Sequence, residues 1–296
     1  LVDASTTYEE FMTLRQRLDA IDLRNFEDKI RLRRNLLQPL GILHTPTFYM
    51  SNEDPNILEH IVALESYVVK PTHMTESEHV AVVHRGHHIF DVQLNGEVVR
   101  QAGELADPKL LQKRVLDAWN RTAYEWECKA VVSATPGVIV ESLVLATLDP
   151  GWPEKERVEE VRCHVIWGEA LAVEWSVGRK GSSVFVADID DKGRKSFSTV
   201  SHWISQMEDL SILDPDGWVE TVMTKCIPMA QLQAQRVASA VGADHLRVDF
   251  LVEGNCDQIY VSEVELFPAV PFHAKVMEVI EKRWRYGYGY DSGAGF

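Results

Sequence analysis

Hydrophobic and polar positions follow a helical period in three parts of the chain. Residues 8–38 contain neither Gly nor Pro and place apolar side chains at helical intervals, as at Phe11, Leu14, Leu18 and Ile21. This spacing predicts helices, with a break near Asn25. Residues 106–126 and the Ala- and Gln-rich segment 229–243 also have this period, and the latter is predicted to end at Gly242.

Other segments have the short apolar runs and the turn residues of β-strands. Strands are predicted from Tyr67 to Lys70, in 137–145, and as strand pairs in 80–100, 158–177 and 246–268. Asn95-Gly96 and Trp167-Gly168 provide the turns of two of these pairs. The stretch around 188–193 is polar and is assigned no element. Hairpins mixed with helices indicate an α+β fold with mostly antiparallel sheets, not a doubly wound one.

The chain is long enough for more than one packed unit. It has 296 residues, of which 45% are hydrophobic. We predict an N-terminal helical segment at 1–66, a small lobe at 67–140 and a larger lobe at 141–284. The Gly- and Tyr-rich residues 285–296 are predicted to be a flexible tail.

Charge and cysteine content narrow the function classes. The formal net charge is −15, which argues against a nucleic-acid partner or an anionic membrane surface. No apolar run is long enough to span a membrane. The chain opens without the segments of a secretory signal, and its four cysteines form no C-x-x-C pair. We therefore expect a cytoplasmic protein with reduced thiols.

Lys70 ends an otherwise apolar strand. Lysine is rarely buried without a partner, so this position predicts an anionic group at the strand end. The alternatives are an ordinary edge lysine and a lysine whose apolar stem reaches along the surface to water.

Three carboxylates near the C-terminus are candidates for a metal site. Asp249 lies on the first strand of a predicted hairpin, and Glu263 and Glu265 lie on one face of the second. Converging carboxylates repel one another unless a cation neutralises them, and hard oxygen ligands suit Mg²⁺. Arg247 is predicted to share their face. The alternative is the solvated polar face of an antiparallel sheet.

Six segments, in order over about residues 28 to 270, resemble the ATP-grasp fold, specifically its TupA-like branch of polysaccharide and teichuronopeptide biosynthesis. They are Asp28-Lys29 with Arg33 and Arg34, Val69-Lys70-Pro71-Thr72-His73, Val138 to Glu141, Glu160-Val-Arg162, Arg247-Val-Asp249, and Glu263 to Pro268. The resemblance implies two α+β lobes that clamp a nucleotide between their sheets.

The resemblance also implies a role for each matching residue. Lys29 and Lys70 would contact nucleotide phosphates, and the loop with His73, Thr75 and Ser77 would close over them. Glu141 would open the hinge that recognises adenine, and Glu160 would bind the ribose. Mg²⁺ would be held by Asp249, Glu263 and Glu265. Arg247 would stabilise developing charge, and Arg162 with His164 would bind the phosphates or an acidic substrate.

The loop after Lys70 departs from the family pattern. The family has glycines there, whereas this chain has His73-Met-Thr-Glu-Ser-Glu. Either the loop closes differently, with Thr75 or Ser77 donating hydrogen bonds, or nucleotide binding is weakened. Glu265 is a smaller departure, because a third carboxylate still binds Mg²⁺.

The expected function is that of an ATP- and Mg²⁺-dependent carboxylate–amine ligase. ATP would phosphorylate a substrate carboxylate, and an amine would attack the acyl phosphate to form an amide. The expected partners are small molecules, an amino-acid- or sugar-acid-like carboxylate and an amine. Two alternatives stay open: a small-molecule kinase of the same fold, and a degenerate ligand-binding protein without turnover.

Overall fold

The computed structural model describes residues 6–18, 26–72, 79–89, 92–94, 97–100, 102–121, 135–146, 158–177, 181–189, 195–204, 220–266, 268 and 274–289. The chain divides into two compact units. Unit 1 comprises Leu1–Asp19, Leu40–Leu43 and Val144–Phe296, and unit 2 comprises Ala20–Pro39 and His44–Leu143. The four-part division predicted from the sequence stays a prediction.

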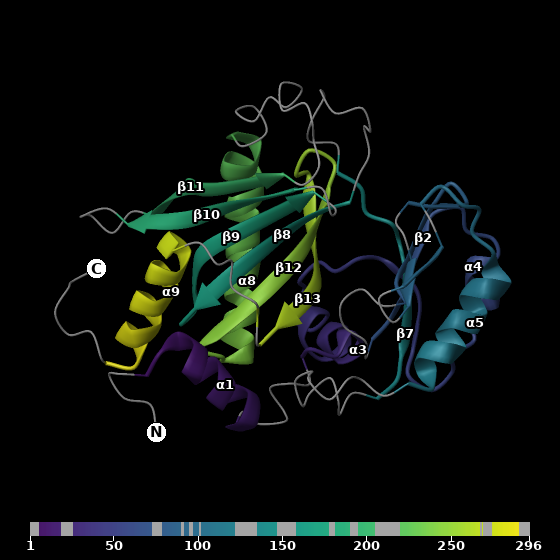
Figure 1. Cartoon of the computed structure of the whole chain (residues 1–296), viewed down its shortest axis with the longest axis horizontal. Helices are drawn as coiled ribbons and strands as arrows, with labels where there is room; N and C mark the ends of the chain where they lie inside the picture. The colour runs from purple at the N-terminus through teal and green to yellow at the C-terminus, as the bar shows by residue number, and fades with distance from the viewer. Residues whose placement is uncertain are drawn as a thin grey trace. The chain divides into compact units, whose positions relative to one another are not determined.

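Unit 2 is built on a five-stranded antiparallel sheet with the order β1-β7-β2-β3-β4, of which Figure 1 labels β2 and β7. Its strands are β1 (Thr47–Ser51), β2 (Tyr67–Pro71), β3 (Ala81–His84), β4 (His87–His88) and β7 (Val138–Glu141). The central strands β2 and β7 are buried at every residue. Both faces of these strands are covered, which explains why their sequences are apolar rather than alternating, apart from Lys70 in β2 and Glu141 in β7.

A separate two-stranded sheet of unit 2 consists of β5 (Val92–Leu94) and β6 (Glu97–Arg100). These strands pair antiparallel, as the sequence predicted. The predicted turn residues Asn95 and Gly96 lie outside the described residues.

Helices α4 (Leu58–Ile61) and α5 (Pro108–Trp119) cover part of the unit 2 sheet. Asp107 caps α5 by accepting a hydrogen bond from the Lys109 backbone N–H at 2.9 Å. The core side chains of α5 recur at helical spacing, at Leu111, Val115 and Ala118. Helix α5 therefore packs the face that carries these three side chains against the sheet, and its opposite face is exposed.

The predicted N-terminal helices are present in the described part of residues 8–38. They are α1 (Tyr8–Leu18) in unit 1, and α3 (Lys29–Arg31) followed by the π-helix η1 (Leu32–Leu37) in unit 2. Asp28 caps α3 by accepting from the backbone N–H groups of Ile30 and Arg31.

Unit 1 contains a six-stranded antiparallel sheet with the order β11-β10-β9-β8-β12-β13. The strands are β8 (Glu159–Ile166), β9 (Glu169–Val177), β10 (Gly181–Ile189), β11 (Lys195–Ile204), β12 (His245–Glu253) and β13 (Gln258–Glu265). Helix α8 (Ile227–Val241) lies on one face, and α1 and α9 (Ala274–Gly287) lie on the other (Figure 1). The predicted α+β class, with mostly antiparallel sheets, is confirmed.

Local signals place the ends of several unit 1 elements correctly. Trp167 and Gly168 both have positive φ, 50° and 78°, as the predicted tight turn between β8 and β9 requires. Gly242 ends α8 in the left-handed conformation, with φ 74°.

Strands β10 and β11 have no counterpart in the predicted elements. Their sequence contains few large apolar residues at alternate positions, and the polar stretch 188–193 falls where the hairpin ends. Strand β10 pairs with β9, a buried strand, and this pairing stabilises a strand that the sequence of β10 alone does not predict.

Helix α9 extends to Gly287, beyond residue 285, where the predicted tail begins. The reason is packing: Trp284 is 1% exposed, and its ring lies 4.4 Å from that of Phe11 on α1. Residues 290–296 lie outside the described residues.

Cys226 and Cys256 form a disulfide, so the prediction of reduced thiols was wrong for this pair. Cys226 precedes α8 and Cys256 lies in the turn between β12 and β13, with their Cα atoms 5.4 Å apart. They are 30 residues apart in the sequence, and only the packing of α8 beside the hairpin brings them together. Cys163 is buried and belongs to no disulfide among the described residues.

Candidate functional site

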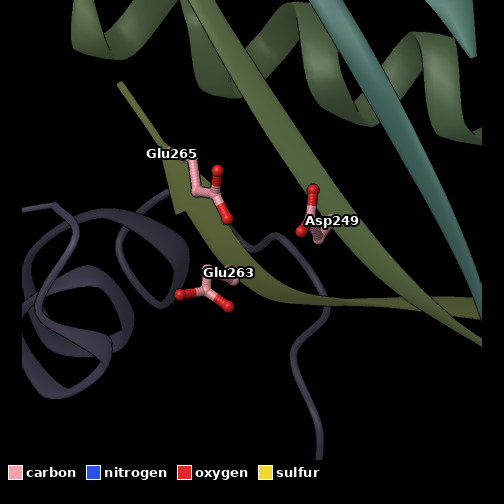
Figure 2. A group of neighbouring side chains, drawn as sticks. All are labelled: Asp249, Glu263 and Glu265. Carbon is pink, nitrogen blue, oxygen red and sulfur yellow. The ribbon is translucent and has the colours of Figure 1, made fainter. Parts of the chain in front are cut away.

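Polar side chains of unit 1 gather on one face of strands β8, β12 and β13. In the register, Asp249 is opposite Glu263 on one side and Arg162 on the other, while Arg247 is opposite Glu265. Directly opposed residues share a face of the sheet. The β12–β13 hairpin therefore gathers the predicted carboxylates as the sequence indicated, and Figure 2 shows them on the two neighbouring strands.

The three carboxylates fit a hard divalent cation. One oxygen each from Asp249, Glu263 and Glu265 lies within 4.8 Å of the others. Oxygens that share a Mg²⁺ ion at about 2.1 Å are separated by no more than about 4.2 Å, so small side-chain adjustments suffice. Asp249 is only 4% exposed, and the two glutamates are partly exposed. The burial of Asp249 departs from the freely solvated face that was the alternative, whereas the partial exposure of the two glutamates agrees with it.

Arg247 neutralises part of this cluster. Its Nε donates to Asp249 Oδ1 at 2.7 Å, and its Nη2 donates to Asp249 Oδ2 at 2.7 Å and to Glu265 Oε1 at 2.6 Å. Burial alone would lower the pKa of Arg247, but Asp249 and the two glutamates outweigh burial and raise it. The guanidinium is therefore a permanent positive charge beside the carboxylates.

Arg162 links the cluster to two further acidic residues. Its Nη2 donates to Glu160 Oε2 at 2.8 Å, its Nη1 lies 3.7 Å from Glu174 Oε1, and its Nε lies 3.9 Å from Asp249 Oδ2. Burial raises the pKa of Glu160, and the charge of Arg162 opposes that rise. The carboxylate predicted to bind ribose is thus paired with an arginine in this structure.

A second polar cluster lies within unit 2, around Glu141. Lys70 Nζ lies 2.6 Å from Glu141 Oε1, and Arg33 Nη2 donates to Glu141 Oε2. The Thr45 hydroxyl donates to the same Oε2 at 2.8 Å. The Glu141 side chain therefore orients Lys70 and Arg33.

This second cluster contains more positive than negative charge. Arg33 and Lys70 both pair with the one carboxylate of Glu141, and Lys29 lies near enough for its charge to act on Lys70; all four side chains are buried. Burial lowers the pKa of Lys70, with Arg33 and Lys29 adding to the effect, while Glu141 raises it. Burial also raises the pKa of Glu141, but Lys70 and Arg33 outweigh burial and lower it from 4.5 to about 2. An anion bound here would relieve the repulsion among the cations.

The predicted site residues fall into these two clusters. Within unit 1 the structure brings together Glu160, Arg162, Arg247, Asp249, Glu263 and Glu265. Within unit 2 it brings together Lys29, Lys70 and Glu141. The loop residues His73, Thr75 and Ser77, with Glu76 and Glu78, lie outside the described residues.

Arg33 and Thr45 both contact Glu141, and neither was assigned a role from the sequence. Arg33 is 1% exposed, and it also donates to the hydroxyls of Thr45 at 3.1 Å and Thr47 at 2.7 Å. The signal was present for Arg33, because it belongs to the Asp28-Lys29 segment. Nothing local distinguishes Thr45.

Comparisons with known proteins give a likeness in structure alone. No family model matches the sequence, and no curated protein matches it. Among solved structures, D-alanine–D-alanine ligase from Bacillus anthracis is 15% identical, with a TM-score of 0.43, over 89% of this chain and 68% of that chain. The ATP-grasp ligase PsnB, complexed with a minimal precursor, is 12% identical, with a TM-score of 0.38, over 88% of this chain and 61% of that chain.

The macrocyclase MdnC from Microcystis aeruginosa, bound with a precursor peptide, is 11% identical, with a TM-score of 0.40, over 93% of this chain and 68% of that chain. The chain thus spans about three fifths to two thirds of the length of these structures. Because each TM-score is below 0.5, the α+β assignment rests on the sheets and helices of this chain. Among the described helices, none combines the length and hydropathy needed to cross a lipid bilayer.

Proposed function

We propose that the protein is an ATP- and Mg²⁺-dependent carboxylate–amine ligase of the ATP-grasp type, in the TupA-like branch. The observation that carries the proposal is the carboxylate cluster: Asp249, Glu263 and Glu265 offer ligand oxygens within 4.8 Å of one another, beside a buried arginine. This is the donor set for Mg²⁺ with nucleotide phosphates. The order of the six sequence segments supports the choice of ATP as the nucleotide.

In this proposal the cationic cluster of unit 2 binds nucleotide phosphates. Lys29 and Lys70 supply ammonium groups for charge-assisted hydrogen bonds to phosphate oxygens. Glu141 holds Lys70 in place through an ion pair, and Arg33 pairs with the other oxygen of the same carboxylate. The excess of positive charge supports an anionic ligand of this kind.

The carboxylate cluster of unit 1 would hold Mg²⁺ through Asp249, Glu263 and Glu265. A bound Mg²⁺ supplies neutralisation of phosphate charge and orientation of the phosphoryl group. Arg247, rigidly held by Asp249, would stabilise negative charge that develops on the transferred phosphoryl group and on the tetrahedral adduct of the amine. Glu160 and Arg162 would contact the ribose and the anionic groups of the ligands.

The reaction would proceed in two balanced steps. An oxygen of the substrate carboxylate attacks the γ-phosphorus of ATP, the bond to the β–γ bridging oxygen breaks, and ADP leaves with its electron pair. The amine then attacks the acyl carbon, loses a proton and expels phosphate, which leaves an amide. We propose a small amino-acid- or sugar-acid-like carboxylate as the acceptor.

An assay of ADP release tests this function against the two alternatives. ADP production that requires Mg²⁺, a carboxylate and an amine is the expected result. Phosphorylated product without amine would identify a kinase instead. A protein whose thermal transition does not respond to Mg²⁺ and a non-hydrolysable ATP analogue would be a non-catalytic binding protein.

Two variants give this assay its controls. Lys70→Met removes a proposed phosphate contact and should raise KM for ATP at least about tenfold, as expected for loss of a charged hydrogen bond. Lys275→Met changes an exposed lysine on α9 and should leave KM unchanged. Equal KM values for ATP in the two variants would contradict the assignment of Lys70.

A further inference from the structure

A line of three buried polar side chains runs from helix α1 to strand β8 within unit 1. The Tyr8 hydroxyl contacts His245 Nδ1, and His245 Nε2 lies 3.4 Å from His164 Nδ1. Tyr8 is 4% exposed and both histidines are 0% exposed. Buried polar atoms are normally hydrogen-bonded, so the direction of each bond in this line can be worked out.

The tyrosine sets that direction. Burial raises the pKa of the Tyr8 phenol, so the hydroxyl keeps its proton. Its hydrogen-bond partner among the described residues is His245 Nδ1, so the buried O–H donates its hydrogen bond to that nitrogen. Burial also lowers the pKa of both histidines, that of His164 to about 3, so each ring is neutral and carries one N–H. His245 must then carry its proton on Nε2 and donate to His164 Nδ1. The His164 proton is therefore on Nε2.

The His164 Nε2–H is the last donor of the line. His164 Nε2 is shielded from water and has no hydrogen-bond partner among the residues that the structure describes. A buried donor in this condition destabilises the protein until an acceptor arrives. Bulk water cannot be that acceptor.

His164 lies at the edge of the carboxylate site. It is opposite Arg247 in the register and two residues from Arg162, so the three side chains share one face of the sheet. The charges of both arginines act on the His164 ring. An oxygen held by these guanidinium groups would be the acceptor that His164 lacks.

Charge determines which ligand this oxygen can belong to. The face carries two arginines against five carboxylates, namely Glu160, Glu174, Asp249, Glu263 and Glu265. The face is therefore negative overall, and the neutral N–H of His164 does not change its charge. An anionic ligand is repelled from this face unless Mg²⁺ binds with it. A carboxylate substrate that binds after the metal is expected to depend on Mg²⁺ in this way.

We propose that His164 is a substrate-binding residue whose Nε2–H donates to an oxygen of the substrate carboxylate. Tyr8 and His245 are positioning residues that keep His164 in its donor form. The inference rests on the proposed ligase function for the identity of the ligand. Arg162, two residues from His164 on the same strand, has a side chain that is 31% exposed and so can reach a ligand from solvent.

The first test needs no ligand. Nitrogen NMR of protein labelled at its 11 histidines reports which ring nitrogen carries the proton, and His164→Gln identifies the His164 signals. The expected result is an Nε2–H ring for both His164 and His245. An Nδ1–H ring or a charged ring at His164 would overturn the proposal even if the protein is a ligase.

The second test uses acetate as a carboxylate probe, with Mg²⁺ present. His164→Gln keeps an amide N–H near the position of Nε2, whereas His164→Asn moves it toward the position of Nδ1. Acetate should shift the His164 Nε2 resonance. Affinity should fall about tenfold in His164→Asn and less than about threefold in His164→Gln, as expected for loss and retention of one hydrogen bond.

Tyr8→Phe tests the positioning role. It should produce a mixture of ring forms at His245 and His164 and weaken acetate binding, while the far-ultraviolet circular dichroism stays unchanged. No shift of His164 with acetate, or equal affinities in the Gln and Asn variants, would overturn the proposal. Failure of ADP release in the wild type, with these NMR results intact, would count against the ligase alone.

Discussion

Arg247 binds both carboxylate oxygens of Asp249, with Nε 2.7 Å from Oδ1 and Nη2 2.7 Å from Oδ2. The same Nη2 lies 2.6 Å from Glu265. The arginine therefore neutralises two of the three groups that are proposed to bind Mg²⁺. Binding of Mg²⁺ must therefore be energetically coupled to the contacts of Arg247 with Asp249 and Glu265.

Replacing Arg247 with Met should make the fold depend on Mg²⁺. Loss of Arg247 leaves the buried carboxylate of Asp249 without its nearest counter-ion, which destabilises a protein by about 3 kcal/mol or more. Mg²⁺ should raise the melting temperature of this variant more than that of the wild type. Arg247→Lys is the matched control because it keeps the charge but loses the two-pronged geometry. Equal Mg²⁺-induced shifts in wild type and Arg247→Met would contradict the coupling.

Asp249→Asn and Glu263→Gln should each remove a charged metal ligand. The fold should persist in Asp249→Asn because the new amide oxygen can still accept a hydrogen bond from Arg247, which also keeps Glu265 as a partner. We expect Mg²⁺ affinity to fall at least about tenfold, as for loss of a charged ligand, and ATP turnover to be lost. Titration calorimetry with Mg²⁺ measures the first effect without any substrate. Glu253→Gln, at the exposed end of the same strand, should behave as the wild type. Full activity in both site variants would remove the metal assignment.

Glu141→Gln should strongly destabilise unit 2. It leaves Lys70 and Arg33 buried without their shared carboxylate, and such a change costs about 3 to 5 kcal/mol. Chemical denaturation measures the effect. Glu59→Gln alters a carboxylate in the same unit that is 76% exposed, and it should change stability by less than about 0.5 kcal/mol.

The same carboxylate predicts a dependence on pH. The folded pKa of Glu141, about 2, is below the ordinary value of 4.5, so the ionised group contributes its full stability above pH 4.5. That contribution is lost as the pH falls from 4.5 toward 2. The wild type should therefore lose stability more steeply than Glu141→Gln over this range. Parallel acid denaturation curves would show that Glu141 is not responsible.

The disulfide between Cys226 and Cys256 should join two peptides in a non-reducing digest. In the chain-entropy description, closing a loop of 30 residues stabilises the fold by about 3 to 4 kcal/mol. Denaturation of the double variant Cys226→Ser, Cys256→Ser, compared with Cys163→Ser, measures this contribution. Recovery of both cysteines as free thiols without a reductant would contradict the pairing.

Features that are determined within one hairpin or helix are predictable from the sequence. The convergence of Asp249, Glu263 and Glu265 follows from strand alternation and one short turn, and the structure has that register. The end of α8 at Gly242 follows from a local conformational preference. Strands β10 and β11 were not predicted, because their pairing depends on β9 more than on their own pattern.

The sequence by itself determined the α+β class, the periods of most helices and strands, and the face shared by the carboxylates. These features depend on backbone hydrogen bonds and side-chain alternation over a few residues. Only the tertiary structure decided that Glu141 joins Lys70 to Arg33, and that Tyr8 reaches His164 through His245. Those contacts join segments far apart in the chain, and the packing of whole elements, which no local period encodes, brings them together.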